Sequence, residues 1–139
     1  MKRTLVIVAL LLLAGCVQLP PTPQDIQAKR FEAIPDKAVI YIVRPGVDSP
    51  NGGPIVVGDL GMITTYQGTY YRWEVAPGTH RIYGFGPTSA AVTVRAEAGK
   101  VYFVQHTVLG NRRDGVQTMS LQQIGDGEGR RLVSGAQLI

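Results

Sequence analysis

Cys16, His80 and His106 carry the side chains of this chain that most often perform catalysis or bind metals. They are the single cysteine and the two histidines among 139 residues. Neither histidine has a cysteine, an acidic residue or the other histidine at the spacing of metal ligands. Because His80 follows a turn at residues 77–78, we expect its ring to hydrogen-bond the backbone there. An enzyme, or a metal or small-ligand binder, that uses His80 or His106 is the alternative function that these residues leave open.

Serine nucleophiles and a calcium loop are the next candidates, and neither has its full pattern. The Gly-x-Ser-x-Gly turn of α/β-hydrolases surrounds none of Ser49, Ser89, Ser120 or Ser134. Residues 125–129 (GDGEG) have the composition of a calcium loop, but they lack further oxygen ligands at alternating positions and a closing glutamate. We therefore expect a turn at residues 125–129, and we predict no catalytic residue, no metal and no cofactor.

The thiol of Cys16 stands in the pattern of a lipid-modified cysteine. Basic Lys2 and Arg3 precede an apolar run at residues 4–14, which is the order of an export signal. At about 1.5 Å of rise per residue, this run covers roughly half of a 30 Å hydrocarbon core, so it does not span a membrane stably. The residues before Cys16 resemble the lipobox of bacterial lipoproteins; they are Leu13, Ala14 and Gly15. The resemblance implies that residues 1–15 are a signal peptide and that acyl chains such as palmitate anchor Cys16 to a membrane.

The residues after Cys16 predict where the anchor holds the chain. An aspartate directly after the lipidated cysteine resembles an inner-membrane retention signal of enterobacteria, so Val17 implies the outer membrane, facing the periplasm. The prolines that follow favour an extended, semi-rigid tether. Thr22 predicts the N-cap of a short helix over residues 24–32. Residues 16–35 are therefore expected to form the tether.

The composition fits one globular domain. A chain of 139 residues has the usual size of a single domain, and 45% hydrophobic with 17% charged residues excludes a disordered chain. Its 17 glycines and 9 prolines favour short strands joined by turns. The net charge is +4, and the loss of Lys2 and Arg3 leaves about +2, which is too little to indicate nucleic acid binding. Once Cys16 is acylated, no cysteine remains for a disulfide, so packing must stabilise the domain.

The hydrophobic pattern predicts an all-β fold over residues 36–139. The run at residues 38–43 (AVIYIV) is typical of a strand buried on both faces. Residues 69–75 alternate with a period of two, which predicts a half-buried strand whose Trp73 points inward. Further strands are expected at 55–57, 60–65, 80–85, 90–96, 101–109 and 116–124, with a last short one at 131–133. No segment has the helical pattern that parallel crossovers need, so we expect an antiparallel β-sandwich of about seven to eight strands.

The same alternation predicts a candidate partner surface. If Tyr71 and Trp73 belong to the core, Tyr70 and Arg72 point outward from the same strand. An aromatic side chain beside a cation is a common pair at protein interfaces. Tyr70 and Arg72 are therefore the residues that we expect a partner to contact.

Three blocks of sequence follow one another at residues 37–44 (KAVIYIVR), 68–80 and 98–104 (AGKVYFV). In this order they resemble a bacterial family of unknown function, the domain of unknown function numbered 2846. The middle block is also similar to PEGA-type domains, small β modules of bacterial cell surfaces, which implies an immunoglobulin-like or transthyretin-like sandwich. The family implies no catalytic residue.

Together these observations predict a non-catalytic lipoprotein of the cell envelope whose β-sandwich binds a protein or another envelope partner. A structural accessory of an envelope complex is a further alternative. The identity of the partner and the oligomeric state stay open.

Overall fold

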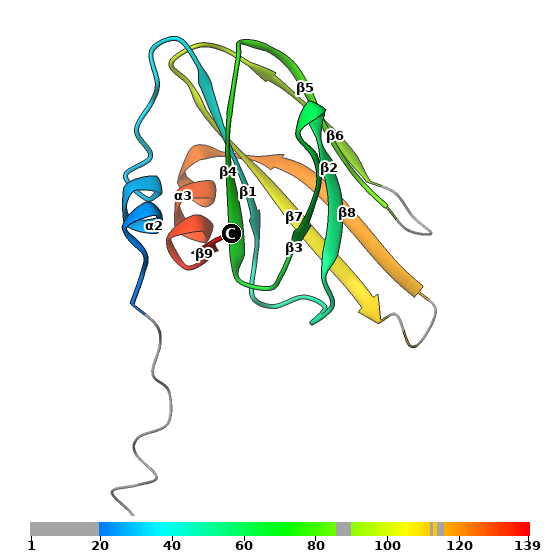
Figure 1. Cartoon of the computed structure of the whole chain (residues 1–139). Coiled ribbons are helices and arrows are strands. Elements are labelled where there is room, and N and C mark those ends of the chain that lie inside the picture. Colours follow the sequence, from blue (N-terminus) through cyan, green and yellow to red (C-terminus); the bar gives the residue numbers. More distant parts are fainter. Residues whose placement is uncertain (1–19, 86–89, 112, 114–115) are drawn as a thin grey trace, which may run out of the picture.

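The computed structural model describes residues 20–85, 90–111, 113 and 116–139. They form two β-sheets that face each other, and two helices pack on the outer face of one sheet (Figure 1). The β-sandwich predicted from the hydrophobic pattern is confirmed. The predicted signal peptide with its lipobox, Cys16 and Val17 lie outside the described residues.

The larger sheet has the strand order β8-β7-β1-β4-β9. Its strands are β1 (Ala38–Arg44), β4 (Thr69–Val75), β7 (Val101–Asn111), β8 (Val116–Ile124) and β9 (Gln137–Leu138). β1 is antiparallel to β4 but parallel to β7, and β9 is parallel to β4, so this sheet is mixed rather than wholly antiparallel. No helix is needed between the parallel strands β1 and β7, because the chain returns through the second sheet.

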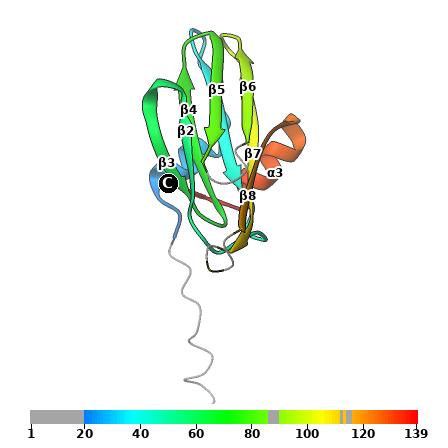
Figure 2. The same ribbon diagram turned by 90° about the vertical axis from the view of Figure 1, so that its right-hand side faces the viewer.

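The smaller sheet has the order β3-β2-β5-β6 and is antiparallel throughout. Its strands are β2 (Gly53–Val57), β3 (Gly61–Thr65), β5 (Gly78–Gly84) and β6 (Ala91–Ala96), and a 3-10 helix η1 (Gly58–Leu60) joins β2 to β3. On one side of the sandwich β6 contacts β8 across the two sheets (Figure 2). The nine described strands include the short β9, which the sequence did not predict.

β1 supplies both hydrophobic cores, as its continuous apolar run predicts. Ile40 and Ile42 face the smaller sheet, while Tyr41 and Val43 face the helices. The core between the sheets consists of Ala38, Ile40, Ile42, Ile55, Val57, Val75, Ile82, Val94, Ala96, Val104 and Leu121, and Trp73 packs against it from inside as predicted. The core under the helices consists of Ala28, Val39, Tyr41, Val43, Tyr70, Phe103, Val133 and Ala136.

The first described helix, α2 (Pro23–Ala28), begins where the sequence predicts. The Thr22 hydroxyl accepts a hydrogen bond from the N–H of Asp25 at 3.1 Å, which is the expected N-cap. The helix ends earlier than residue 32, and Phe31 then adopts a positive φ of 55°. Because Ala28 packs into the core under the helices, the end of the expected tether belongs to the folded domain.

The second helix, α3 (Asp126–Ser134), corrects two predictions. Residues 126–134 form a helix, so the turn expected at residues 125–129 and the strand expected at residues 131–133 are both wrong. The glycines lower helix propensity, but one of them is required by packing: a Cβ on Gly129 would lie 2.1 Å from Cγ of Phe103. Asp126 and Arg130 form an ion pair of 2.8 Å across one turn. Tertiary contact with the sheet thus overrides the local signal for a turn.

Candidate binding surface at the free edge of β4

Tyr70 does not lie on the surface, which corrects half of the predicted partner surface. Its side chain is fully buried, because α2 and α3 cover the outer face of β4. Its hydroxyl donates to the carboxylate of Asp25 at 2.8 Å. Burial and this hydrogen bond raise the pKa of Tyr70 far above its ordinary value of 10.0. Tyr70 is a structural residue that fastens α2 to the sheet.

Arg72 remains partly exposed on the same face of β4. Its Nε donates to the hydroxyl of Tyr41 at 3.3 Å, and its Nη1 binds the carboxylate of Glu74. Lys37 lies 3.7 Å from the same carboxylate. The hydrogen bond from Arg72 lowers the pKa of Glu74 below its ordinary value of 4.5. These contacts hold the guanidinium of Arg72 against the sheet.

The edge of β4 that faces away from β1 is paired along only part of its length. β9 pairs with Thr69 and Tyr70, and the N–H of Ile139 donates to the carbonyl of Tyr70 at 3.0 Å. Peptide groups alternate along a strand, so the N–H and C=O groups of Arg72 and Glu74 point to the same side as those of Tyr70. Beyond β9 no strand of the described residues pairs with them.

The hydrogen bonds of β1 also indicate that the peptide groups of Arg72 and Glu74 point away from β1. The N–H of Val39 donates to the carbonyl of Lys100 at 3.0 Å, so alternate peptide groups of β1, beginning with Val39, face β7. The remaining groups of β1, at Ile40 and Ile42, then face β4 and meet Trp73 and Tyr71 in the register. The peptide groups of Arg72 and Glu74 are therefore free of the β1–β4 ladder.

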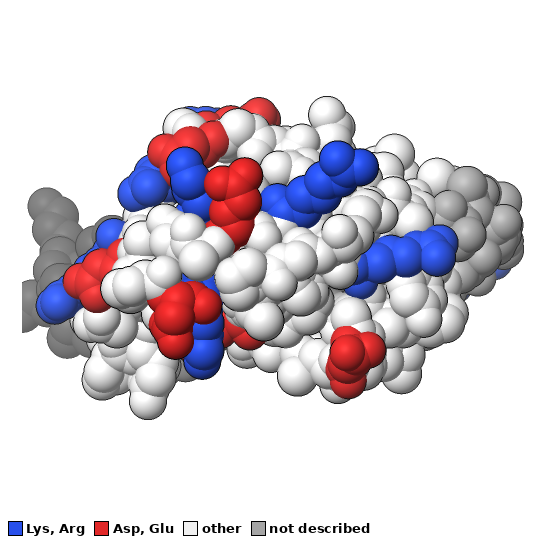
Figure 3. Space-filling view, turned by 90° about the horizontal axis from the view of Figure 1, so that it is seen from above, with Lys and Arg blue, Asp and Glu red and all other residues white. Residues whose placement is uncertain are grey.

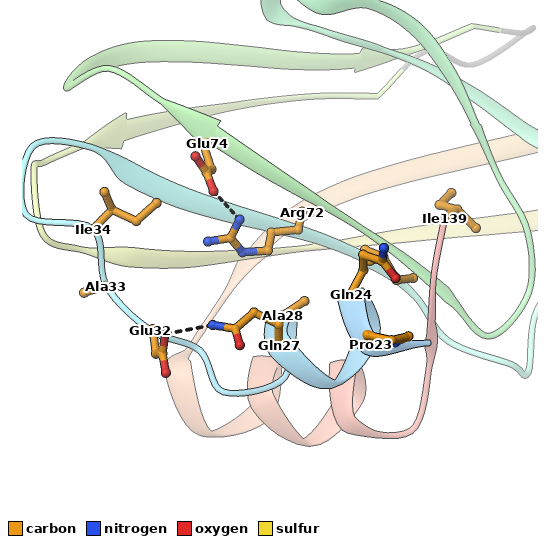
Figure 4. A pocket seen from close by; sticks show the side chains of 11 residues that line it. Pro23, Gln24, Gln27, Ala28, Glu32, Ala33, Ile34, Arg72, Glu74 and Ile139 are labelled. Atoms are coloured by element: carbon orange, nitrogen blue, oxygen red, sulfur yellow. Dashed lines mark hydrogen bonds and ion pairs between the residues drawn. The ribbon is translucent and has the colours of Figure 1, made fainter. Parts of the chain in front are cut away.

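One groove follows the outer side of this edge and has a volume of about 710 Å³. Figure 4 shows α2 and the segment after it along one wall, with Arg72 and Glu74 of β4 along the other. Gln27 Nε2 donates to the carboxylate of Glu32 at 3.0 Å within the first wall. The lining residues are Pro23, Gln24, Gln27, Ala28, Glu32, Ala33, Ile34, Arg72, Glu74, Leu138 and Ile139. Most of the polar groups in this outer groove are amides or charged side chains.

A second groove, of about 630 Å³, follows the inner side of the same edge. Trp73 is one of its lining residues, and the indole ring meets the ring of His80 edge-on with centroids 5.2 Å apart. The Nε2 atom of His80 lies 2.7 Å from the carbonyl oxygen of Ala76, as predicted for the turn. The backbone of η1 closes the groove over the indole, because a Cβ on Gly58 would lie 2.6 Å from Cη2 of Trp73. The lining residues are Gly58, Asp59, Leu60, Trp73, Val75, Ala76, Thr79, His80, Arg81 and Tyr83.

The two grooves flank one free strand edge. Arg72 and Glu74 line the outer groove, while Trp73 and Val75 line the inner groove, as alternation along β4 requires. Seen from above, the end of the molecule carries acidic and basic side chains side by side, without a large area of one sign (Figure 3). Both signs of charge also line the two grooves, with Arg72 and Glu74 in the outer groove and Asp59 and Arg81 in the inner groove. The surface is therefore distinguished by unpaired peptide groups and alternate side-chain grooves rather than by charge.

His106 lies apart from this surface, inside a buried polar cluster. Its Nδ1 lies 2.9 Å from the hydroxyl of Thr65, and burial together with the charge of Arg44 lowers its pKa to about 4. His80 and His106 stand on strands of different sheets and share no hydrogen-bond partner. Within the described ranges, no three histidine, cysteine, aspartate or glutamate side chains group as metal ligands.

Sequence reasoning missed the buried ion pair and the inner groove. Arg44 ends an otherwise apolar strand and Asp48 follows four residues later, which is a local signal for a buried pair. The inner groove has no such signal, because its lining comes from β4, β5 and η1.

The described part of the chain contains no helix long and apolar enough to cross a bilayer. No family model matches the sequence, and comparison with curated proteins gives no match either.

Proposed function

We propose that this chain is a lipid-anchored, non-catalytic protein of the bacterial cell envelope, whose β-sandwich binds a protein partner at the edge of β4. The proposal that β4 binds a partner rests on one observation: the unpaired peptide groups of Arg72 and Glu74 lie between two open grooves. Native proteins usually cover or interrupt such an edge, since it invites pairing with another chain. An uncovered edge with side-chain grooves on both faces is suited to recognition.

The anchoring part rests on the lipobox that ends at Cys16. Because Asp25 holds α2 on the sheet, only residues 16–22 separate the proposed lipid from the sandwich. Seven extended residues span at most about 25 Å, so the domain stays close to the membrane surface. Val17 supports the outer membrane as the site of the anchor. The blocks at 37–44, 68–80 and 98–104 support membership of the domain of unknown function numbered 2846. They form β1, then β4 with the connection that crosses to β5 in the other sheet, and the start of β7.

The anchor is tested by labelling cells with an alkyne analogue of palmitate and separating the membranes. We expect label on the wild-type protein in the outer-membrane fraction. Cys16→Ala should carry no label and keep residues 1–15. Wild-type cleavage and membrane retention of Cys16→Ala would refute the lipid anchor.

The partner surface is tested by photo-crosslinking in living cells. Gln24 lines the outer groove and Thr79 the inner groove, and both are exposed. A photoreactive amino acid at either position should yield the same discrete adduct. Gln122, exposed on β8 at the opposite side of the sheet, is the matched control and should yield none. Equal adducts from all three positions would exclude β4 as the binding surface.

A further inference from the structure

We propose that the occupant of this surface is an extended segment of the partner protein, which adds to the larger sheet as a strand beside β4. The inference rests on the proposed function and specifies its binding mode. An unpaired strand edge supplies alternating N–H donors and C=O acceptors, which an extended main chain satisfies without regard to its sequence.

β9 shows that this edge accepts a strand. It occupies the positions beside Thr69 and Tyr70, and the free edge of Arg72 to Val75 continues along the same line. Four residues of strand span about 13 Å, so a segment of roughly four to six residues fits the free edge.

The two grooves lie where the side chains of an added strand must go. Successive side chains of a strand point to opposite faces of the sheet. Beside β4, one set would enter the outer groove near Arg72 and Glu74, and the other set the inner groove near Trp73 and His80. Both grooves combine polar and apolar side chains: Arg72 and Glu74 lie with Ile34 and Ile139 in the outer groove, and Trp73 and Leu60 lie with Thr79 and Arg81 in the inner groove. Recognition therefore depends on the main chain of the added segment, and each of its faces can carry polar or apolar side chains.

The width of the surface favours a single strand over a second sandwich. α2 stands beside the free edge on the outer face, and η1 stands beside it on the inner face. A lone extended segment fits between these two walls, whereas the edge of another copy would bring its own α2 and η1 into the same space.

The main-chain contact can be removed at one atom. Glu74→Pro deletes an N–H that points to the open edge and takes no part in the β1–β4 ladder, a position where strands tolerate proline. Glu74→Ala is the control, because it removes the ion pairs with Arg72 and Lys37 but keeps the N–H. In cells that carry the photoreactive residue at Gln24 or Thr79, Glu74→Pro should lower the adduct at least tenfold, and Glu74→Ala less than threefold.

The outcomes separate the two proposals. Absence of an adduct in the otherwise wild-type protein would overturn the proposed function. A wild-type adduct that Glu74→Pro leaves unchanged would overturn strand addition alone. An adduct with the mass of two copies of this chain would show self-pairing and would also overturn the inference.

A second measurement does not depend on the folding of the proline variant. The probe is an acetylated and amidated hexapeptide of alternating threonine and valine, added to the purified full-length protein in detergent. We expect slower hydrogen exchange at the amides of Arg72 and Glu74, and a saturable change in the fluorescence of Trp73, the single tryptophan. The same peptide N-methylated at alternate residues should lose both effects. Unchanged exchange at these two amides in saturating hexapeptide would contradict strand addition.

Discussion

The Nδ1 atom of His106 lies 2.9 Å from the hydroxyl oxygen of Thr65, and both side chains are fully buried between the sheets. The Thr65 hydroxyl donates to the carbonyl of Gly53 at 3.2 Å, so the protonated Nδ1 donates to Thr65. The Nε2 atom then has no hydrogen-bond partner among the described residues. A second proton on His106 would place a charge beside the guanidinium of Arg44. The sandwich is therefore built around a neutral histidine.

The first prediction concerns stability in mild acid. The pKa of His106 is about 4 in the folded protein and has an ordinary value of 6.5, so the unfolded state binds its proton first as the pH falls. The free energy of unfolding therefore keeps its full value above pH 6.5. It falls by up to about 3 kcal/mol as the pH is lowered from 6.5 to about 4. Urea unfolding at pH 7.0, 5.5 and 4.5 measures this loss.

Two variants assign the loss to one residue. His106→Gln is neutral at every pH and should flatten the dependence between pH 6.5 and 4.5. His80→Gln keeps the buried histidine and should retain the full dependence. A flat profile for His80→Gln would mean that the wrong histidine has been identified.

The second prediction concerns the buried ion pair of Arg44 and Asp48. Nε of Arg44 lies 3.0 and 2.9 Å from the two carboxylate oxygens, and its other nitrogens donate to the carbonyls of Ser49 and Thr65. Asp48→Asn keeps the shape but leaves a buried charge uncompensated, so it should destabilise the fold by about 3–5 kcal/mol. Urea unfolding measures it. In a double-mutant cycle with Arg44→Met, the double variant should lose at least about 1 kcal/mol less than the two single losses together, and strict additivity would refute the coupling.

The third prediction compares two glycines of α3. A Cβ on Gly129 would meet the ring of Phe103, whereas a Cβ on Gly127 would meet no atom within 4 Å. Gly127→Ala should stabilise the protein by up to about 1 kcal/mol, because alanine has the higher helix propensity. Gly129→Ala should destabilise it by about 1–3 kcal/mol, since the helix must move away from the sheet. Thermal unfolding of both variants checks the sign, and stabilisation by both would show that α3 does not pack on Phe103.

The fourth prediction concerns Asp25. Its carboxylate accepts hydrogen bonds from the Tyr70 hydroxyl, from the N–H of Leu138 at 3.0 Å and from Lys29 Nζ at 2.8 Å. Burial alone would raise the pKa of Asp25, but the bonds from Lys29 and Tyr70 lower it overall. Asp25→Ala should speed amide exchange in α2 and at Leu138 at least tenfold, because the buried Tyr70 hydroxyl loses its carboxylate acceptor.

The matched control for Asp25→Ala is the exposed carboxylate of Asp36. Asp36→Ala should leave exchange in α2 unchanged. In both variants the central strand β1 should stay protected. Loss of protection in β1 after Asp25→Ala would show global unfolding in place of a local release.

The sequence predictions were correct where a feature depends on neighbouring residues, and wrong where it depends on residues far apart in the chain. The apolar run of β1 and the alternation of β4 correctly predict the strands and the inward Trp73, because strand periodicity is local. The outward direction of Tyr70 was also right, yet α2 covers it: the Tyr70 hydroxyl donates to Asp25, and Lys29 Nζ lies 5.7 Å from the centre of the Tyr70 ring. The burial of Tyr70 was missed because this short helix was expected to belong to the tether, and because the glycines at residues 125–129 favoured a turn where α3 completes the same core.

The candidate surface depends on pairing that no local pattern encodes. Whether β4 is an edge strand follows from β9, which pairs with it from the far end of the described chain. The inner groove lies between β4, η1 and β5, which are brought together only by the fold. The sequence predicted that Trp73 points inward, but it did not predict that Trp73 also lines a groove. A period of two shows which face a residue occupies, but not which strand will stand beside it.

The contacts of Asp25 have a mechanical consequence for a domain held by its N-terminal side. Tension along the chain before Pro23 would reach α2 first and pass through Asp25 to Tyr70 on β4 and Leu138 on β9. The load would thus enter the sheet at the strand edge proposed to hold the partner, and it would also reach the central strand β1, whose Tyr41 hydroxyl donates to the carbonyl of Ala28 at 2.6 Å. In such an arrangement the anchor and the bound segment pull on the same few hydrogen bonds, so their resistance to rupture would set how firmly the membrane and the partner are coupled.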